Sequence, residues 1–230
     1  MRMELRPAVR ALGARRQVLD DVRLYRARRS GTDVYVATLG VGPEIARRRT
    51  EGLLSLLERR GTKVAHVVVT GVAGGIDGVS PIGTLVVPAR VIDLATSDSY
   101  SSARLGRVEP VDTMATSGRE LITDAAVLSG LRARGVRALD METAAVAAVC
   151  RDHGDIPWTA FRAISDRPDD QIVDSDVASL LHDDGRADVI GALRLIARHP
   201  RRIPDFVRLG RESALAARVA AEAAAGAITG

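Results

Sequence analysis

Short apolar runs rich in β-branched residues alternate along this chain with longer stretches of helical periodicity. We expect four strands, at residues 34–38, 64–70, 84–92 and 158–164. We expect helices at residues 44–60, 142–152 and 212–225. The third strand is long and is expected to bend. This alternation predicts an α/β layer fold with a largely parallel or mixed sheet.

The organisation of the chain indicates one domain. No internal repeat and no linker separates two cores, and 230 residues suffice for one sizeable core, so the range 1–230 is expected to fold as a unit. Residues 194–230 are expected to form a helical C-terminal tail, because their alanine-rich part has high helix propensity. That helix is expected to pack outside the sheet or against a partner subunit.

Composition narrows the class of protein. The chain is 46% hydrophobic and 27% charged, as in ordinary soluble globular proteins. Its 33 basic and 29 acidic residues leave a net charge of +4, which does not indicate a nucleic-acid surface. No apolar run approaches the ~18 residues of a membrane span, so we expect a cytosolic protein without a membrane partner. Cys150, the single cysteine, is interpreted as a small buried hydrophobe.

The first candidate for a ligand site is VVVTGVAGGIDG, residues 67–78, interpreted as a buried strand that runs into a glycine-rich turn. Glycines allow a backbone to approach a ligand closely. A dinucleotide site is one alternative, since Asp93 lies ~20 residues further on. The spacing of Gly71, Gly74 and Gly75 is not that of a dinucleotide fingerprint, and Pro81 falls where its helix should begin. No cofactor and no metal are therefore expected.

Two further segments carry charge in apolar surroundings. LDMETAAVAAVC, residues 139–150, opens an apolar helix with two acids; Asp140 as an N-cap and Glu142 as a complement to the helix dipole would explain them. FRAISDRPDD, residues 161–170, places Arg162 and Asp166 on a core strand, where unpaired charge is expensive. That strand ends as strands do at the ligand-binding edge of open α/β sheets. A surface salt bridge between Arg162 and Asp166 is the structural alternative.

Together, and in this order, the three segments resemble the purine nucleoside phosphorylase superfamily, most closely its branch of nucleosidases for methylthioadenosine and S-adenosylhomocysteine. LGVGPEIARRRTEGLL resembles the glycine turn and following helix of that family, and TSGRELITD resembles its base-binding segment. The resemblance covers about residues 1–170. It implies a three-layer α/β/α fold around a central mixed sheet, and a homodimer.

The resemblance also implies a reaction, the cleavage of the N-glycosidic bond between a purine and ribose. Asp166 matches the acid that protonates or hydrogen-bonds the base at N7, and Glu142 with Met141 matches the pair that holds the ribose. Arg162 matches a residue that positions the nucleophile. MRMELRP resembles a segment that supplies a water-activating carboxylate, here Glu4. The expected partners are thus a purine nucleoside and either water or phosphate.

Base binding and the nucleophile are where the chain departs from the family pattern. The resemblance implies base contacts from Val72, Ala73, Gly74, Leu121 and Ile122. Val72 and Leu121 stand where nucleosidases carry a serine and a stacking aromatic residue. Val69 and Val72 also stand where phosphorylases carry a phosphate-binding arginine and serine, which favours water.

Alternatives remain for the nucleophile and for the start of the fold. Arg47, Arg48 and Arg49 could supply a phosphate site, so phosphorolysis, including that of adenosyl-hopanoids, is the close alternative. A nucleoside-binding member without catalysis is another. The family's first core strand, before the segment that contains Glu4, is missing from residues 1–230. Either that strand is absent from the protein, or the true start lies upstream.

Overall fold

The structure is a computed structural model that describes residues 2–118, 122–167 and 203–230. Its main sheet has seven strands, listed along the chain: β4 (Val67–Gly75), β5 (Leu85–Val86), β6 (Pro88–Asp93), β7 (Ser99–Ser101), β8 (Asp112–Thr116), β9 (Val136–Asp140) and β10 (Trp158–Asp166). Their spatial order is β5-β10-β4-β9-β8-β6-β7. β10 runs parallel to β4, and β8 runs parallel to both β6 and β9, whereas β5, β7 and the short β4–β9 contact are antiparallel. The predicted mixed sheet is confirmed.

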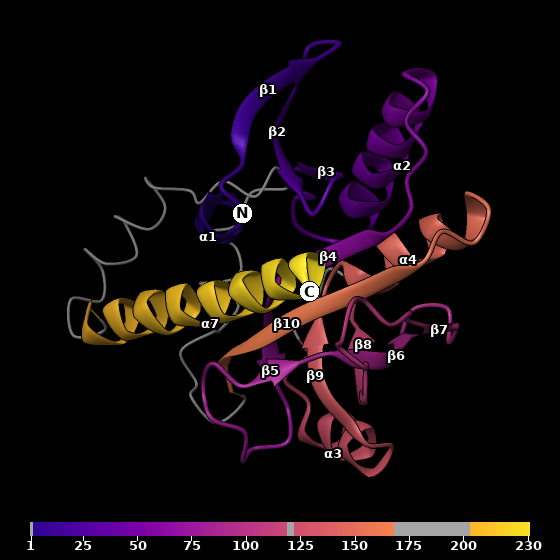
Figure 1. The fold of residues 1–230 in the computed structure, drawn as a ribbon. Helices are drawn as coiled ribbons and strands as arrows, with labels where there is room; N and C mark the ends of the chain where they lie inside the picture. Colours follow the sequence, from indigo (N-terminus) through magenta and orange to yellow (C-terminus); the bar gives the residue numbers. More distant parts are fainter. Residues whose placement is uncertain (1, 119–121, 168–202) are drawn as a thin grey trace.

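A second, three-stranded sheet is formed by β1 (Arg15–Leu19), β2 (Val22–Arg29) and β3 (Thr32–Val36). It is an antiparallel meander, drawn in indigo and violet in Figure 1. Two-residue turns join its strands, and both residues of each turn have positive φ: Asp20 and Asp21 in one, Ser30 and Gly31 in the other. Such turns match the right-handed twist of paired strands.

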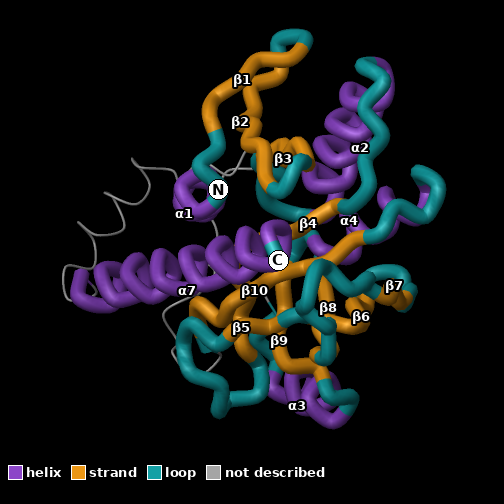
Figure 2. Tube along the Cα trace, in the orientation of Figure 1, coloured by secondary structure: helices purple, strands orange, loops and turns teal. Residues whose placement is uncertain are grey.

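Helices cover both faces of the main sheet (Figures 1 and 2). The helices are α1 (Arg2–Ala11), α2 (Pro43–Arg59), α3 (Ala125–Ala133), α4 (Thr143–Asp152) and α7 (Ile203–Thr229). α4 packs on one face of the sheet, and α2 packs against α4. α7 crosses the other face over β10 and β4, and α1 packs against α7. The three-layer α/β/α arrangement is confirmed. None of these described helices is long and apolar enough to cross a membrane.

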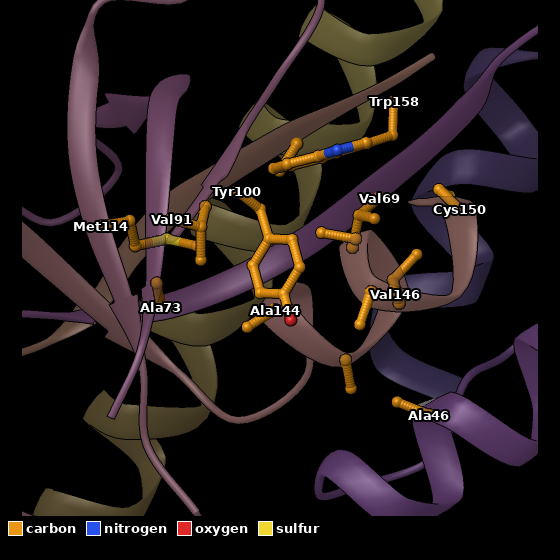
Figure 3. Packing of buried hydrophobic residues seen from close by; sticks show 14 of the residues in the cluster. Ala46, Val69, Ala73, Val91, Tyr100, Met114, Ala144, Val146, Cys150 and Trp158 are labelled. Atoms are coloured by element: carbon orange, nitrogen blue, oxygen red, sulfur yellow. The ribbon is translucent and has the colours of Figure 1, made fainter. Parts of the chain in front are cut away.

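Strand β10 shows why the layers form here. Alternate residues of a strand face opposite sides of its sheet. Ala160 and Ile164 belong to the hydrophobic cluster that packs on α4, whereas Phe161 and Ala163 meet the alanine face of α7. Figure 3 shows other members of the α4 cluster, among them Trp158 of β10 and Val146 of α4. A strand buried on both faces reads as a nearly continuous apolar run, which is why the sequence predicts it well.

The predicted strand and glycine turn at residues 64–78 need correction. β4 begins at Val67 and continues through Gly75, so Gly71, Gly74 and Gly75 belong to the strand. They are required by close packing: a Cβ on Gly71 would lie 2.7 Å from Nη1 of Arg162, and one on Gly75 would lie 2.8 Å from Cγ2 of Ile164. The glycines serve the approach of protein side chains to the strand.

Other boundaries differ for local reasons. The expected strand 84–92 is split into β5 and β6, because the Asp112 carboxylate accepts the Val87 N–H at 2.9 Å and the register shifts after Pro88. The helices expected at residues 44–60 and 142–152 are confirmed as α2 and α4, and α7 is much longer than residues 212–225.

Replacing Gly75 by valine tests the role of the strand glycines. The new side chain would overlap buried Ile164, so we expect the free energy of unfolding in urea to fall by about 1–3 kcal/mol. Gly52→Ala on α2 is the matched control: its Cβ meets nothing within 4 Å, and the change should stabilise the helix by up to ~1 kcal/mol. Equal stability of Gly75→Val and the wild type would contradict this account.

Candidate active site

A cavity of about 710 Å³ opens where the carboxyl ends of β4, β9 and β10 meet. The turn before α2 and the first helix of the chain close its sides. Four of the charged residues that the sequence singled out line this cavity: Glu4, Glu142, Arg162 and Asp166. Met141, Val72, Ala73, Gly74 and Ile122 line it as well. Its volume is in the range of small-molecule sites.

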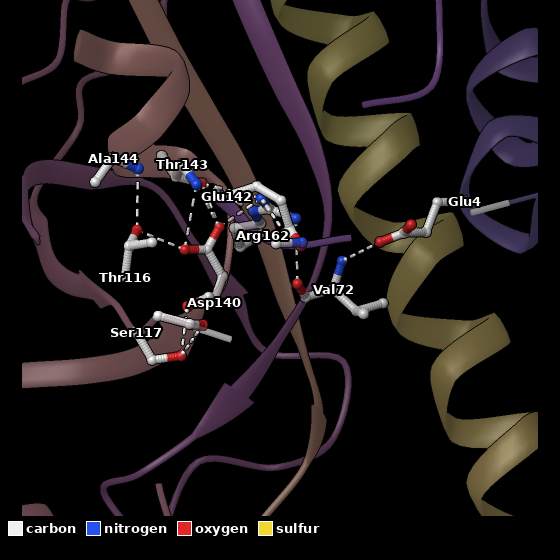
Figure 4. Close-up of polar contacts among 11 residues, drawn as sticks. Glu4, Val72, Thr116, Ser117, Asp140, Glu142, Thr143, Ala144 and Arg162 are labelled. Atoms are coloured by element: carbon white, nitrogen blue, oxygen red, sulfur yellow. Dashed lines mark hydrogen bonds and ion pairs between the residues drawn. The ribbon is translucent and has the colours of Figure 1, made fainter. Parts of the chain in front are cut away.

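Arg162 occupies the centre of the polar network in Figure 4. Its side chain comes from β10 and is buried, 3% exposed. Nη2 lies 2.5 Å from Oδ2 of Asp140 and 3.4 Å from Oε2 of Glu142. Nη2 and Nε also donate to the Thr143 hydroxyl at 3.0 and 3.2 Å, and Nη1 donates to the Val72 carbonyl at 3.3 Å. The predicted alternative, a surface salt bridge between Arg162 and Asp166, is wrong because Arg162 lies inside the protein.

The charge of Arg162 is maintained by its neighbours. Burial alone would lower the pKa of this guanidinium, because it disfavours the charged form. The nearby carboxylates of Asp140, Glu142 and Glu4 outweigh burial and raise the pKa of Arg162. The site therefore holds a permanent, fixed positive charge.

Asp140 links this charge to the start of α4. Its carboxylate accepts hydrogen bonds from the Thr116 hydroxyl at 2.7 Å and from the N–H and hydroxyl of Thr143. The sequence predicted Asp140 as the N-cap residue of this helix; by position the N-cap is Glu142, whose own side chain makes no cap bond. Although Asp140 lies two residues before this N-cap, its carboxylate accepts the Thr143 N–H, which has no partner within the helix.

Glu142 turns away from its helix toward the glycine turn before α2. Its Oε1 accepts the Gly42 N–H at 3.0 Å, and Gly42 adopts a φ of 88°, a backbone conformation that favours glycine. Burial raises the pKa of Glu142 to about 7 despite the opposing effects of Arg162 and of the Gly42 hydrogen bond; Asp140 and Glu4 raise it further. Glu142 can thus take up or release a proton near neutral pH.

Glu4 reaches the site from α1. Its Oε1 accepts the Val72 N–H at 3.1 Å, so side chains from α1 and β10 bond both backbone groups of Val72 (Figure 4). A Cβ on Gly71 would collide with the Glu4 carboxylate as well as with Arg162. The absence of a side chain at Gly71 is what lets Glu4 and Arg162 approach each other.

Asp166 ends β10 on the same cavity. Asp166 pairs with Gly74 of β4, and the pairing register of the two strands shifts between Ile164 and Asp166. Such irregularities redirect side chains at the ends of strands. Oδ1 of Asp166 accepts the Ser165 hydroxyl at 2.6 Å, and Oδ2 lies 3.2 Å from where a Cβ on Gly74 would stand. Asp166 thus lies directly over the backbone of β4.

The remaining predicted residues lie elsewhere. Arg47 and Arg48 are exposed on α2, where Arg47 is 3.9 Å from Glu51 and 3.7 Å from Asp152. Arg49, the third arginine of this predicted phosphate site, is the member of the run that lines the cavity. The predicted base contact Leu121 lies outside the described residues.

Two other types of chemistry find no support in the described part of the chain. No group of three or more His, Cys, Asp or Glu side chains there could hold a metal ion. Cys150 is buried, and burial raises the pKa of its thiol to about 12, so it is a poor nucleophile at neutral pH.

The sequence analysis missed three supporting residues. Thr143 and Thr116 orient Asp140 and Arg162, and Gly42 fixes Glu142. Thr143 directly follows the acid-Met-acid triplet, which is a usable signal. No local pattern around Thr116 indicates that it bonds an aspartate 24 residues later.

Comparison with known proteins gives consistent results. The family model for the phosphorylase superfamily matches residues 14–126 and 113–197. A 5′-methylthioadenosine/S-adenosylhomocysteine nucleosidase of Glaesserella parasuis serovar 5 is 28% identical over 180 residues, which cover 64% of this chain and 74% of the relative.

Two solved structures share the fold. The Helicobacter pylori 5′-methylthioadenosine/S-adenosylhomocysteine nucleosidase has a TM-score of 0.64 at 16% identity, over 96% of this chain and 91% of its own. The futalosine hydrolase of Helicobacter pylori strain 26695 has a TM-score of 0.63 at 17% identity over the same shares. Since the family model spans most of the chain, the protein belongs to the phosphorylase superfamily.

Proposed function

We propose that this protein hydrolyses the N-glycosidic bond of a purine nucleoside of the methylthioadenosine type. The observation that carries the proposal is the meeting of Glu4, Glu142, Arg162 and Asp166 on one cavity. These residues come from α1, from β10 and from the start of α4. Together they can bind the base and the sugar and position the nucleophile. The 28% identical nucleosidase relative supports the same reaction.

The leaving purine needs a proton, because a purine anion is a poor leaving group. Asp166 is assigned this role: it lies over Gly74 at the end of β10, and a general acid typically contributes ~10²–10⁴ in rate. Ser165 donates to its Oδ1 and so orients the carboxyl group. The positive charge of Arg162 would oppose protonation of Asp166. Arg162 is paired with the carboxylates of Asp140 and Glu142 and donates to the Val72 carbonyl, which weakens that effect.

Glu142 is assigned to the ribose. An ionised carboxylate accepts hydrogen bonds from two adjacent hydroxyls and stabilises positive charge that develops on the sugar in the transition state. Gly42 and Arg162 hold its two oxygens in position. Met141, beside it on the cavity wall, supplies an apolar surface for the sugar.

The electrostatics of the site favour water over phosphate as the nucleophile. The carboxylates of Glu4, Asp140, Glu142 and Asp166 line the cavity, and Arg162 already pairs with two of them; Arg49, Lys63 and Arg167 also line it. A phosphate dianion beside Arg162 would meet the carboxylates that surround this arginine, which disfavours its binding at that position. A water molecule near Gly71 could instead donate to Glu4 and accept from Arg162.

Several expectations accompany the proposal as predictions. The protein is expected to fold as one domain, to form a homodimer and to act in the cytosol. Phosphorolysis through Arg47, Arg48 and Arg49, and nucleoside binding without catalysis, are the competing functions.

The function is tested by incubating the protein with methylthioadenosine, adenosine and inosine, with and without phosphate, and separating the free base by chromatography. We expect base release in the absence of phosphate. Release only with phosphate would establish phosphorolysis. No release, together with a rise in Tm on adding a nucleoside, would establish binding without catalysis.

Asp166→Asn tests the acid. We expect kcat to fall by ~10²-fold or more with little change in KM, because the amide keeps the shape of the side chain but cannot give up a proton in the same way. Asp152→Asn, an exposed substitution at the end of α4, is the control and should leave kcat unchanged. Wild-type turnover in Asp166→Asn would remove Asp166 from the acid role.

The pKa of Glu142 predicts a pH dependence. If the ionised carboxylate binds the ribose, kcat/KM should rise with pH up to about 7 and then level, since this parameter reports the free enzyme. Glu142→Gln should lower kcat/KM and remove that rise. Glu58→Gln on the exposed side of α2 should retain the wild-type profile.

A ligand-free measurement checks the pKa itself. The folded pKa of about 7 exceeds the ordinary value of 4.5, so the folded protein binds more protons than the unfolded chain between these two values. Stability must then fall as pH rises through this window. The contribution of Glu142 to stability is measured as the difference in Tm between the wild type and Glu142→Gln. If this difference is the same at every pH from 4.5 to 7, the pKa of Glu142 is not raised.

A further inference from the structure

Two buried threonines bond the carboxylate of Asp140 (Figure 4). Thr116 ends β8 and is 2% exposed, and Thr143 begins α4 and is fully buried. Neither threonine lines the cavity, although Asp140 and Arg162 do. Any effect of these two hydroxyls on the reaction must therefore act through a neighbouring side chain.

The direction of each hydroxyl follows from its partners. A threonine hydroxyl carries one proton and two lone pairs, and arginine can only donate. The Thr143 oxygen accepts from Nε of Arg162 at 3.2 Å and from its Nη2 at 3.0 Å, and gives its proton to Oδ2 of Asp140. Thr116 accepts the Ala144 N–H at 3.0 Å and gives its proton to Oδ1 of the same carboxylate. We refer to Thr116, Asp140 and Thr143 as the hydroxyl clamp.

Within the hydroxyl clamp, Asp140 is the closer counter-ion of Arg162. Its Oδ2 lies 2.5 Å from Nη2 of the arginine, whereas Oε2 of Glu142 lies 3.4 Å from the same nitrogen. The attraction between opposite charges weakens with distance, so the contact with Asp140 is the stronger. Glu142 therefore keeps lone pairs for the ribose hydroxyls that the proposed function assigns to it.

The same contacts decide which way the guanidinium faces. Nε and Nη2 are held on the side of Thr143 and Asp140, so Nη1 is the nitrogen that extends toward β4. Nη1 donates to the Val72 carbonyl at 3.3 Å and lies 2.7 Å from where a Cβ on Gly71 would stand. Oε1 of Glu4 lies beside the same place. The planar guanidinium cannot turn Nη1 away without losing the bonds at its opposite edge.

We propose that the hydroxyl clamp positions Arg162 for the attack of water on the nucleoside. The inference rests on the proposed function, in which Arg162 and Glu4 share the attacking water molecule. Thr116 and Thr143 are positioning residues: they lie outside the cavity lining and act by holding Nη1 where that water binds. A displacement of about 1 Å at a reacting group can cost ~10²-fold in rate, so the hydroxyls matter for turnover.

Thr143→Val and Thr143→Ser test the hydroxyl clamp. Valine keeps the shape of threonine without the hydroxyl, whereas serine keeps the hydroxyl. In Thr143→Val we expect kcat for base release to fall by ~10-fold or more with KM changed by less than about threefold, because the groups that bind the nucleoside stay in place. Thr143→Ser should retain most of the wild-type kcat. Wild-type kcat in Thr143→Val overturns the proposal.

Thr159→Val is the matched control, because it removes a buried hydroxyl from β10 itself. The Thr159 hydroxyl donates to the Ala103 carbonyl at 2.6 Å near the start of the strand, whereas Asp166 ends it. We expect this substitution to lower Tm and to leave kcat unchanged. An equal loss of kcat in Thr159→Val and Thr143→Val would be a general effect of lower stability and would overturn the proposal.

A second measurement needs no turnover. A buried, hydrogen-bonded guanidinium N–H exchanges slowly with water, so the Nε–H of Arg162 can be followed by NMR of protein labelled in arginine. Its exchange should become at least about tenfold faster in Thr143→Val and stay slow in Thr143→Ser. Unchanged exchange in Thr143→Val overturns the proposal. If the wild type releases no base, the proposed function fails, and this comparison still decides whether the hydroxyl clamp holds Arg162.

Thr116→Val decides the question if Thr143→Val does not fold. This substitution acts one bond further from Arg162, through Asp140 alone. We expect kcat to fall and the Nε–H of Arg162 to exchange faster than in the wild type. Wild-type values of both quantities in Thr116→Val overturn the proposal.

Discussion

The candidate site depends on one buried interaction, the guanidinium of Arg162 against the carboxylates of Asp140 and Glu142. Removing one partner of such a pair is strongly destabilising, by roughly 3–5 kcal/mol, because a charge is left buried without compensation. The ends of β10, β9 and α4 are therefore held together by the same contact that sets the charges of the cavity. Burial raises the pKa of Glu142 despite the attraction of Arg162, so we expect the ion pair to offset the cost of burying this carboxylate only in part.

The backbone of β4 is adapted to this arginine. Gly71 leaves the volume that Arg162 and Glu4 occupy, and Val72 offers its carbonyl to one and its N–H to the other. An ordinary strand residue at Gly71 would separate the two side chains. The glycine-rich stretch therefore brings the Glu4 carboxylate from α1 and the Arg162 guanidinium from β10 together on a strand and not on a loop. A rigid strand holds catalytic geometry more accurately than a loop does.

Sequence patterns predicted the parts of the fold that are buried on both sides. β10 and α4 are nearly continuous apolar segments, and the resemblance to a known family placed Arg162, Glu142 and Asp166 on them. Two strands of the meander, β1 and β2, were missed because they are rich in arginine and bury few side chains, whereas β3 overlaps the strand expected at residues 34–38. The pairing of Arg162 with Asp140 was missed because it joins positions 22 residues apart. The sequence argument gave Arg162 the substrate and nucleophile as partners or, alternatively, a surface salt bridge with Asp166, whereas Asp140 and Glu142 already neutralise much of its charge.

Glu4 links the first helix of the described chain to the chemistry of the site. It lies in the first turn of α1, and its Oε1 accepts the Val72 N–H near the carboxyl end of β4. α1 packs against α7, which in turn covers β10 and β4, so this packing holds the proposed water-activating carboxylate in position. Hydrolysis requires a carboxylate held within hydrogen-bonding distance of a water molecule, so the activation of the nucleophile depends on the packing of α1 on α7.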